Sequence, residues 1–321
     1  MTTVALTGAT GFIGNVLLKH LTSRGFRIKA LHRPRSAPPS TSIDSVEWQA
    51  GDLNNVDSLR KLVANVNAVV HCAGAVRGAT QKQFEQTNTE GVARLLQAAR
   101  EQKVSRFLLM SSLAAREPAL SAYASSKKSG EDILLRDGGK ISWDILRPPA
   151  VYGPGDREML PLLKLIKRGI VPIIGGEKGR FSLLYVDDLA EAVSCLLKSD
   201  ASRQGQCFEL HDGNPGGYTW QQIASIATEL NGRKARCFSI PRCLMEVVGQ
   251  ANARLARLGN YRPMLTPGKV RELFHPDWAC DNAAITRATG WQPQVLFPEG
   301  MKRLFYSPDL SIGAHDDHDK T

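Results

Sequence analysis

The sequence has no long hydrophobic run and no paired cysteines of the kind that bind metal. None of its apolar stretches approaches the roughly 18 residues that a membrane-spanning helix requires. The six cysteines form no CxxC motif and no zinc spacing, so we expect reduced, mostly buried thiols and no metal site. The first strand-like segment begins almost at Met1, which leaves no room for a signal peptide. These absences predict a cytoplasmic protein.

Acidic residues are scarce relative to basic ones. The 321 residues include 41 Lys and Arg against 31 Asp and Glu, which gives a net charge of +10. Residues 233–271 hold nine basic residues and one acidic residue, Glu246, and therefore carry +8. Such a segment could face nucleic acid, an anionic membrane surface or an anionic ligand, or it could be an ordinary solvated surface. We expect no nucleic-acid partner, and contact with a membrane surface is not favoured.

Short apolar runs alternate with longer amphipathic segments in the first half of the chain. This alternation predicts right-handed βαβ crossovers and a parallel sheet covered by helices on both faces. The fold class is therefore α/β, with a doubly wound parallel sheet. The predicted buried strands are 4–7, 28–31, 69–72, 107–110 and 143–146, and the predicted helices are 13–21, 59–66, 84–101 and 122–135.

The alternation loosens after Val151, where proline and glycine become frequent. We expect residues 1–153, together with about 182–212, to form the nucleotide-binding domain. A smaller, discontinuous substrate lobe would comprise 154–181 and 213–307. The polar residues 308–321 are expected to form a flexible tail.

One apolar helical stripe falls within this substrate lobe, between Pro241 and Leu258. Stripes of this spacing usually face a core, so we expect core packing rather than the wall of a ligand pocket. The stripe consists of Leu244, Val247, Val248, Ala251, Leu255 and Leu258.

A glycine-rich segment follows the first predicted strand and opens the first predicted helix. It reads Thr7-Gly-Ala-Thr-Gly-Phe-Ile-Gly14. Glycines at this spacing let the chain turn tightly, approach a pyrophosphate and pack the helix on the sheet. The start of such a helix also attracts phosphates. The segment predicts a dinucleotide site of the Rossmann type, formed by Gly8, Thr10, Gly11, Phe12, Ile13 and Gly14.

The residues after the second predicted strand indicate which dinucleotide binds. An NAD site usually carries an acidic residue there for the ribose hydroxyls. This chain has Leu31-His-Arg-Pro-Arg35 instead, and Arg33 and Arg35 could pair with a 2′-phosphate or be ordinary loop arginines. The missing acid favours NADP, with NAD as the alternative cofactor. Asp52, in Gly51-Asp52-Leu53, is placed to bind the adenine amino group.

A candidate catalytic group follows the fifth predicted strand. Tyr123 and Lys127 are four residues apart on a predicted helix, so they share one face. A phenol beside an ammonium group loses its proton more easily, and such a pair can exchange a proton with a carbonyl or alcohol oxygen. Ser111 and Ser112, at the end of the strand, could offer a hydroxyl to the same oxygen.

Further motifs occur in a fixed order along most of the chain: His71-Cys-Ala-Gly74, Thr87-Asn-Thr-Glu-Gly91, Arg147-Pro-Pro-Ala-Val-Tyr-Gly-Pro154, Leu184-Tyr-Val-Asp-Asp-Leu189 and Gly290-Trp-Gln-Pro293. With the glycine-rich segment, the serines and the Tyr/Lys pair, they resemble the extended short-chain dehydrogenase/reductase family. That family contains sugar-nucleotide epimerases, dihydroflavonol reductases and 3β-hydroxysteroid dehydrogenases.

The resemblance implies roles for individual residues. Tyr123 would be the acid/base, Lys127 would also hold the nicotinamide ribose, and Asn88 would complete the catalytic group. Ser112 matches the family serine better than Ser111, which remains the alternative. The implied cofactor contacts further include Leu53, Cys72, Ala73, Gly74, Ser111, Pro148 and Val151.

The chain departs from the sugar-acting members of that family in two respects. Tyr123 comes only eleven positions after Ser112, whereas many of those members carry a longer substrate-side connection. Sugar dehydratases also need an acid and a base just after the serine, and Ser112-Leu-Ala-Ala115 has neither. Dehydratase chemistry is therefore disfavoured.

Three functions remain open, and a carbonyl reductase is the preferred one. It would be an NADP(H)-dependent oxidoreductase that reduces a ketone or aldehyde on a hydrophobic scaffold to the alcohol, or catalyses the reverse. The alternative is a nucleotide-sugar epimerase or 4-ketoreductase, with Arg157 near the diphosphate. A non-catalytic dinucleotide-binding protein would have lost the Tyr/Lys pair, which this chain retains.

A homodimer is also expected, paired through the predicted helices 84–101 and 122–135, as is common in the family that the chain resembles. The faces that would pair carry Leu95, Ala98, Ile133 and Leu134.

Overall fold

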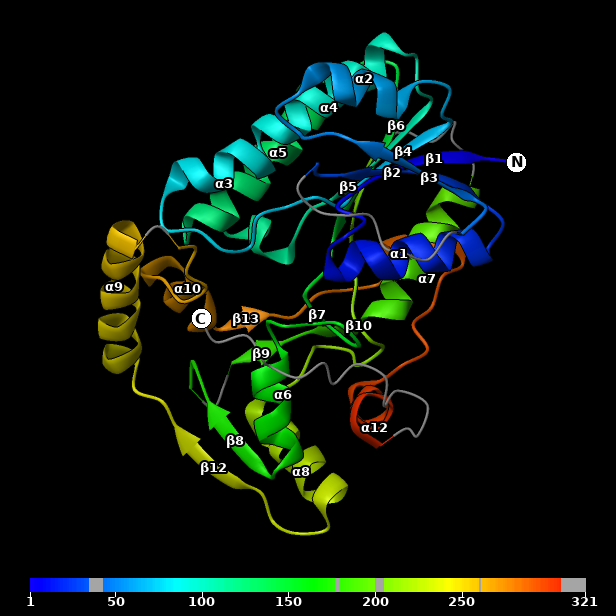
Figure 1. Cartoon of the computed structure of the whole chain (residues 1–321). Helices are drawn as coiled ribbons and strands as arrows, with labels where there is room; N and C mark the ends of the chain where they lie inside the picture. Colours follow the sequence, from blue (N-terminus) through cyan, green and yellow to red (C-terminus); the bar gives the residue numbers. More distant parts are fainter. Residues whose placement is uncertain (35–42, 177–178, 200–204, 260, 307–321) are drawn as a thin grey trace, which may run out of the picture.

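The computed structural model describes residues 1–34, 43–176, 179–199, 205–259 and 261–306 (Figure 1). The predicted tail 308–321 and Arg35 lie outside the described residues. A seven-stranded parallel sheet forms the upper part of the molecule in Figure 1, in the order β11-β6-β5-β4-β1-β2-β3. Its strands are β1 (Thr3–Thr7), β2 (Arg27–His32), β3 (Val46–Ala50), β4 (Ala68–His71), β5 (Arg106–Met110), β6 (Ser142–Arg147) and β11 (Gln206–Glu209).

Helices cover both faces of this sheet, which confirms the predicted doubly wound α/β fold. Successive strand residues point to opposite faces, so Val4 and Leu6 of β1 pack into one core and Ala5 into the other. The first core is covered by α1 (Phe12–Ser23) and α7 (Val186–Lys198). The second core is covered by α2 (Val56–Val63), α4 (Glu90–Glu101) and α5 (Ala122–Asp137).

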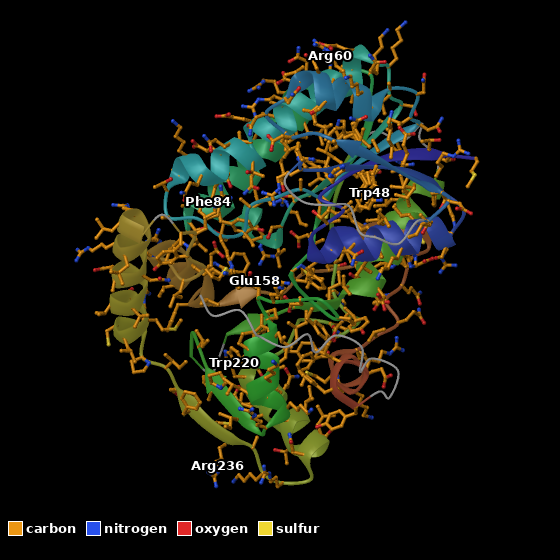
Figure 2. The ribbon with its side chains drawn as sticks, viewed as in Figure 1. Trp48, Arg60, Phe84, Glu158, Trp220 and Arg236 are labelled. Atoms are coloured by element: carbon orange, nitrogen blue, oxygen red, sulfur yellow. The ribbon has the colours of Figure 1, made fainter. Side chains whose placement is uncertain are left out.

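A smaller lobe lies below the carboxyl ends of the strands and has a core of its own (Figure 1). Tyr152, Tyr185 and Phe297 are fully buried at its centre, and Trp220 packs beside Phe181 (Figure 2). Its helices are α6 (Leu160–Lys167), α8 (Trp220–Asn231), α9 (Arg242–Gly259), α10 (Pro267–Leu273) and α12 (Phe297–Tyr306). Short parallel pairs join β7 (Ala150–Tyr152) to β10 (Leu183–Tyr185), β8 (Ile170–Ile173) to β12 (Arg236–Ser239) and β9 (Arg180–Phe181) to β13 (Asp277–Trp278).

The predicted domain limits stay a prediction, but one C-terminal segment packs outside the expected lobe. Helix α11 (Ala283–Thr289) places Ile285 in the first core of the large sheet, and Trp291 joins it there. The Trp291 indole donates to the backbone oxygen of Asp188 in α7. Residues 283–291 therefore cover the nucleotide-binding domain, although the sequence assigned them to the lobe.

The predicted helix over 84–101 is two helices, α3 (Gln81–Asn88) and α4, which meet at Thr89. Packing against α5 explains the break. The Thr89 hydroxyl donates to the backbone oxygen of Ser126, and the Asn88 oxygen lies so close to Gly130 that a Cβ there would be 2.4 Å away. The close contact of residues 88 and 89 with α5 thus interrupts the regular helical geometry at this point.

The contacts expected for a homodimer are corrected by the burial of their side chains. The side chains named for a homodimer are used within the chain: Leu95, Ala98 and Leu134 are fully buried, and Ile133 packs against the same core. A homodimer stays a prediction, but these four side chains cannot form its interface.

The expectation of mostly buried thiols is wrong. The six cysteines are free thiols, of which Cys207, Cys237 and Cys243 are exposed and the other three are partly buried.

The stripe on α9 is the largest departure from expectation. Leu244, Val247, Val248, Leu255 and Leu258 are all exposed, and they do not form a core. No helix among the described residues combines the length and apolarity needed to cross a membrane.

Candidate active site

The glycine-rich turn lies where the strand order of the sheet reverses, between β1 and β4. Gly8 has a φ of +75°, and a Cβ there would lie 2.7 Å from the backbone nitrogen of Ala73. A Cβ at Gly14 would lie 1.9 Å from the Gly8 carbonyl oxygen. Gly11 is the N-cap of α1 and makes no side-chain cap, which leaves the first N–H groups of the helix available to a ligand. This turn therefore fits the pyrophosphate of a dinucleotide.

The end of β2 carries basic rather than acidic side chains. The strand ends at His32, and Arg33 follows it as an exposed residue. Asp52 follows the neighbouring strand β3, and its Oδ1 accepts hydrogen bonds from the backbone and side chain of Asn54 at 2.8 and 2.7 Å. Leu53, the next residue, packs against α4, where a Cβ on Gly91 would lie 3.1 Å from the Leu53 side chain.

The two serines after β5 have different partners. The Ser111 hydroxyl is buried and donates to Glu131 at 2.5 Å. Ser112 begins the short 3-10 turn Leu113–Arg116, where its hydroxyl accepts from the Ala114 nitrogen at 3.2 Å, and it lies close enough to the Tyr123 phenol to lower the pKa of that phenol. The serine that the resemblance favoured is thus the one beside the tyrosine.

Helix α5 brings Tyr123 and Lys127 to the carboxyl end of the sheet. Ser121 caps the helix by accepting from the backbone nitrogen of Ala124 at 2.9 Å. The Tyr123 ring packs edge-on against Phe84 of α3, with the ring centroids 6.0 Å apart. Lys127 is buried, and its Nζ donates to the backbone oxygen of Met110 at 2.9 Å.

Asn88 holds the loop after β4 through its side chain. Its Oδ1 accepts from the Ala75 nitrogen at 2.8 Å, and its Nδ2 donates to the Ala75 oxygen at 3.0 Å. The same Nδ2 donates to the Ser126 hydroxyl at 3.0 Å. These bonds fix the segment Cys72-Ala-Gly74, where a Cβ on Gly74 would lie 3.1 Å from Lys127 Nζ. These bonds give Asn88 a structural role in the loop, and the catalytic role that the resemblance implied stays a prediction.

Burial controls the proton affinities of the site. It raises the pKa of Tyr123 to about 12, against the opposing effect of the nearby Ser112 side chain, and the charge of Glu272 raises the pKa further. Burial also lowers the pKa of Lys127 to about 8. The expectation that Lys127 would make the phenol more acidic is therefore not met, because desolvation dominates. Tyr123 is a protonated phenol at neutral pH, which is the form of an acid.

Two carboxylates near the site were missed by the sequence analysis. Glu131 is fully buried under Ser111 and binds Arg147 through two hydrogen bonds of 2.9 and 2.6 Å. It lies one turn beyond Lys127 on the same helix, so its spacing from Tyr123 was an available signal. Glu272 of α10 bonds the Ser121 hydroxyl, and nothing in the sequence connects these distant residues.

The remaining predicted contacts gather at the same edge of the sheet. Pro148 is buried after β6, and its carbonyl oxygen accepts from the Leu113 nitrogen at 2.9 Å. Val151 lies in β7, which continues from this point. Thr10, Phe12 and Ile13 belong to the turn and the first residues of α1.

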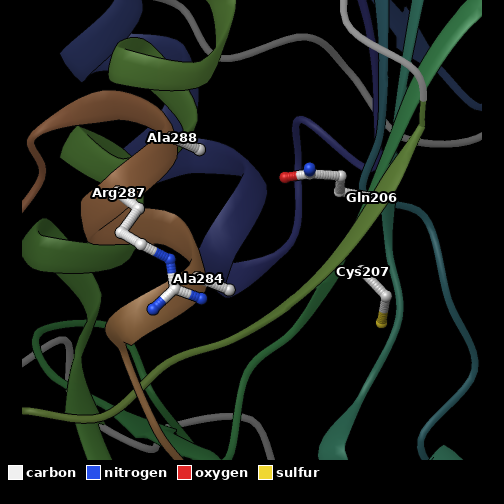
Figure 3. Close-up of a pocket in the computed structure, with 5 residues that line it drawn as sticks. All are labelled: Gln206, Cys207, Ala284, Arg287 and Ala288. Atoms are coloured by element: carbon white, nitrogen blue, oxygen red, sulfur yellow. The ribbon is translucent and has the colours of Figure 1, made fainter.

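A surface cavity elsewhere is not part of this arrangement. It has a volume of about 390 Å³ and lies between β11 and α11, with the Arg287 side chain directed into it (Figure 3). It opens at Gln206, the first residue of β11, and therefore at the amino end of the sheet. The chemistry-bearing residues lie at the carboxyl end, as ligand sites of such sheets do.

Comparison with known proteins agrees with this geometry. Residues 4–210 match the model of the NAD dependent epimerase/dehydratase family. The chain belongs to this family. It is an extended short-chain dehydrogenase/reductase and an NAD(P)-dependent enzyme, as the resemblance implied.

Individual members of this family resemble the whole chain. A ceramide reductase from Caulobacter vibrioides is 33% identical over 91% of this chain and 97% of its own length. A 2-alkyl-3-oxoalkanoate reductase from Stenotrophomonas maltophilia is 25% identical over 94% and 98%, respectively. The structure of MoeE5 in complex with UDP-glucose and NAD has a TM-score of 0.72 and 21% identity, and covers 95% of this chain and 97% of its own. The last comparison shows the shared fold.

Proposed function

We propose that this family member is an NADP(H)-dependent reductase that converts a ketone or aldehyde on a hydrophobic, extended scaffold to the alcohol. The observation that carries the proposal is the half-buried Tyr123 phenol, which lies beside Ser112 and whose pKa is raised to about 12, so that it holds its proton at neutral pH. Reduction needs a proton donor at the carbonyl oxygen, and this phenol is one. The short Ser112–Tyr123 connection and the absence of an acid and a base directly after Ser112, in Leu113-Ala-Ala115, argue against sugar dehydration.

The residues of the site divide the work of reduction. The bound cofactor supplies the hydride that adds to the carbonyl carbon. Ser112 donates a hydrogen bond to the carbonyl oxygen, and Tyr123 gives its proton to that oxygen as the negative charge develops. Lys127 would hold the nicotinamide ribose and assist reprotonation of the phenol. The products are the alcohol and the oxidised cofactor.

NADPH is the proposed reductant, with NADH as the alternative. Arg33 stands where NAD-binding members usually carry an acid, and a charge-assisted bond to a 2′-phosphate contributes about 1.5–3 kcal/mol. Arg33→Ala is therefore expected to weaken NADPH binding about 10- to 100-fold and leave NADH unchanged. The matched control is Arg27→Ala, at the other end of the same strand. Fluorescence titration measures both, and equal affinity for the two cofactors in the wild type would contradict this choice.

The names of two relatives support a lipid-like substrate. One is a ceramide reductase and the other a 2-alkyl-3-oxoalkanoate reductase, and both match almost the whole chain. A nucleotide-sugar epimerase or 4-ketoreductase is the second candidate. It is favoured by the likeness to MoeE5 with UDP-glucose and by exposed Arg157, which follows β7 and could meet a diphosphate.

A substrate panel separates these candidates. Long-chain acyl, aromatic and steroid-like ketones are compared with UDP- and dTDP-sugars while NADPH absorbance is followed. We expect net NADPH consumption with the hydrophobic ketones. Turnover confined to sugar nucleotides, with their binding lost in Arg157→Ala, would replace the reductase by the second candidate.

A further inference from the structure

Helix α9 presents an apolar face to solvent along its entire length. The α9 face consists of Leu244, Val247, Val248, Ala251, Leu255 and Leu258, spaced so that they fall on one side of the helix. Val247 is 65% exposed, Leu255 59% and Leu258 87%. Contiguous exposed apolar patches of this kind mark interaction sites, because exposing apolar surface to water is unfavourable and such patches are rare on surfaces that bind nothing.

The opposite side of α9 is packed tightly against the molecule, so the helix is fixed in this orientation. Gly249 and Ala256 are buried there, and a Cβ on Gly249 would lie 3.2 Å from the backbone of Thr266. The Asn252 side chain donates to the Leu265 oxygen at 2.9 Å. In Figure 1 the helix stands at the outer edge of the lobe, next to α10. Because the opposite side of α9 is packed against the molecule, its apolar face is exposed to solvent.

Basic side chains flank this face. Arg254 and Arg257 lie on α9 itself and Arg262 follows it shortly, all of them exposed. Within the described part of the chain, the salt bridge at this surface joins Arg242 to Glu246, and no carboxylate pairs with Arg254, Arg257 or Arg262.

We propose that the α9 face and its basic rim form a docking surface for an anionic phospholipid membrane. An amphipathic helix with leucine and valine on one side and arginine beside it is suited to lie in the headgroup region, where apolar side chains enter the acyl boundary. The cations complement the negative surface potential of anionic lipid. Nucleic acid would match the cations and leave the apolar face wet. A second copy paired through α9 would bring the arginines of both chains together.

The docking surface is connected to the candidate active site through a single helix. Helix α10 lies between them, and a Cβ on Gly268 would be 2.8 Å from the Ser121 Cβ. Arg271 Nε donates to the Leu120 oxygen at 2.7 Å, two residues ahead of the helix that carries Tyr123. A docked molecule would therefore hold its catalytic tyrosine one helix away from the lipid. Delivery of a lipid-borne ketone rests on the proposed function, whereas docking itself does not.

Vesicle sedimentation tests docking without any substrate. Wild-type protein is mixed with phosphatidylcholine vesicles or with vesicles that also contain phosphatidylglycerol, at low and high salt. We expect binding to the anionic vesicles only, weakened by salt. Leu255→Glu should reduce the affinity at least about 10-fold, because it removes an apolar side chain that the docked protein would bury in the lipid. Arg254→Gln and Arg257→Gln should each reduce it about fivefold.

The matched control is Leu296→Glu, which replaces a leucine that is 48% exposed, against 59% for Leu255, and that directly precedes α12 on the other side of the lobe (Figure 1). It should bind like the wild type, and circular dichroism should show that all variants are folded. Absence of binding to anionic vesicles overturns the proposal, as does equal binding of Leu255→Glu. Tighter binding to a DNA duplex than to vesicles, or a dimer in solution that Val247→Glu dissociates, would also overturn it. Loss of vesicle binding with NADPH-dependent turnover retained leaves the proposed function intact.

Discussion

Ser111 and Ser112 are neighbours in the sequence and face different parts of the molecule, because an extended chain alternates its side chains. Ser111 turns inward to buried Glu131, which is neutralised by Arg147. Ser112 turns to Tyr123. Removing Arg147 would leave Glu131 as an uncompensated buried charge, so this ion pair supports the geometry from beneath.

Replacement of the tyrosine tests its chemical role. Tyr123→Phe removes the proton donor while keeping the ring that packs on Phe84, so we expect kcat to fall about 10²- to 10⁴-fold with NADPH affinity unchanged. Steady-state kinetics and cofactor titration measure the two effects. Near wild-type turnover on an accepted ketone would remove Tyr123 from the mechanism.

The pH dependence of reduction should report Lys127. Its pKa is lowered to about 8 by burial, so the ammonium form predominates below that pH and is lost above it. Tyr123, with a pKa near 12, stays protonated throughout this range. We expect kcat/KM for reduction to be level below pH 8 and then to fall about tenfold per pH unit. In Lys127→Arg, which keeps its charge, this fall should be absent, and a level wild-type profile to well above pH 8 would contradict the assignment.

At the scale of elements, the glycine-rich turn joins β1 to α1 through contact between backbone atoms. No side-chain rotation can relieve a clash between a Cβ at position 14 and the Gly8 oxygen. The turn is thus the most local and the most tightly determined part of the site. This is also why its function could be predicted from eight consecutive residues.

Gly14→Ala should disrupt this turn. We expect a loss of about 1–3 kcal/mol in the free energy of unfolding, together with weakened NADPH binding, because the helix must move away from the sheet. Asn15→Ala, an exposed position one residue further along α1, is the control and should change neither quantity. Urea denaturation and fluorescence titration provide the measurements, and normal cofactor binding in Gly14→Ala would show that the turn is not the pyrophosphate site.

At the scale of the whole molecule, the sequence predicted what is local and periodic. The five strands assigned from apolar runs all occur in the sheet, and the glycine turn, Ser112, Tyr123 and Lys127 meet at its carboxyl end. What could not be predicted depends on packing between distant segments. Glu272 reaches the Tyr123 helix from α10, and the periodicity of α9 gives its amphipathic pattern without saying what covers the apolar side.

The central claim is net hydride transfer from NADPH to a hydrophobic ketone with Tyr123 as the acid. The most direct measurement is incubation of the protein with NADPH deuterated at the transferring position and a long-chain ketone, followed by mass spectrometry of the product. The account predicts an alcohol that carries the deuterium at the carbinol carbon, formed by the wild type and lost in Tyr123→Phe. Sugar-nucleotide epimerisation with no net loss of NADPH, and no labelled alcohol from any ketone, would contradict it.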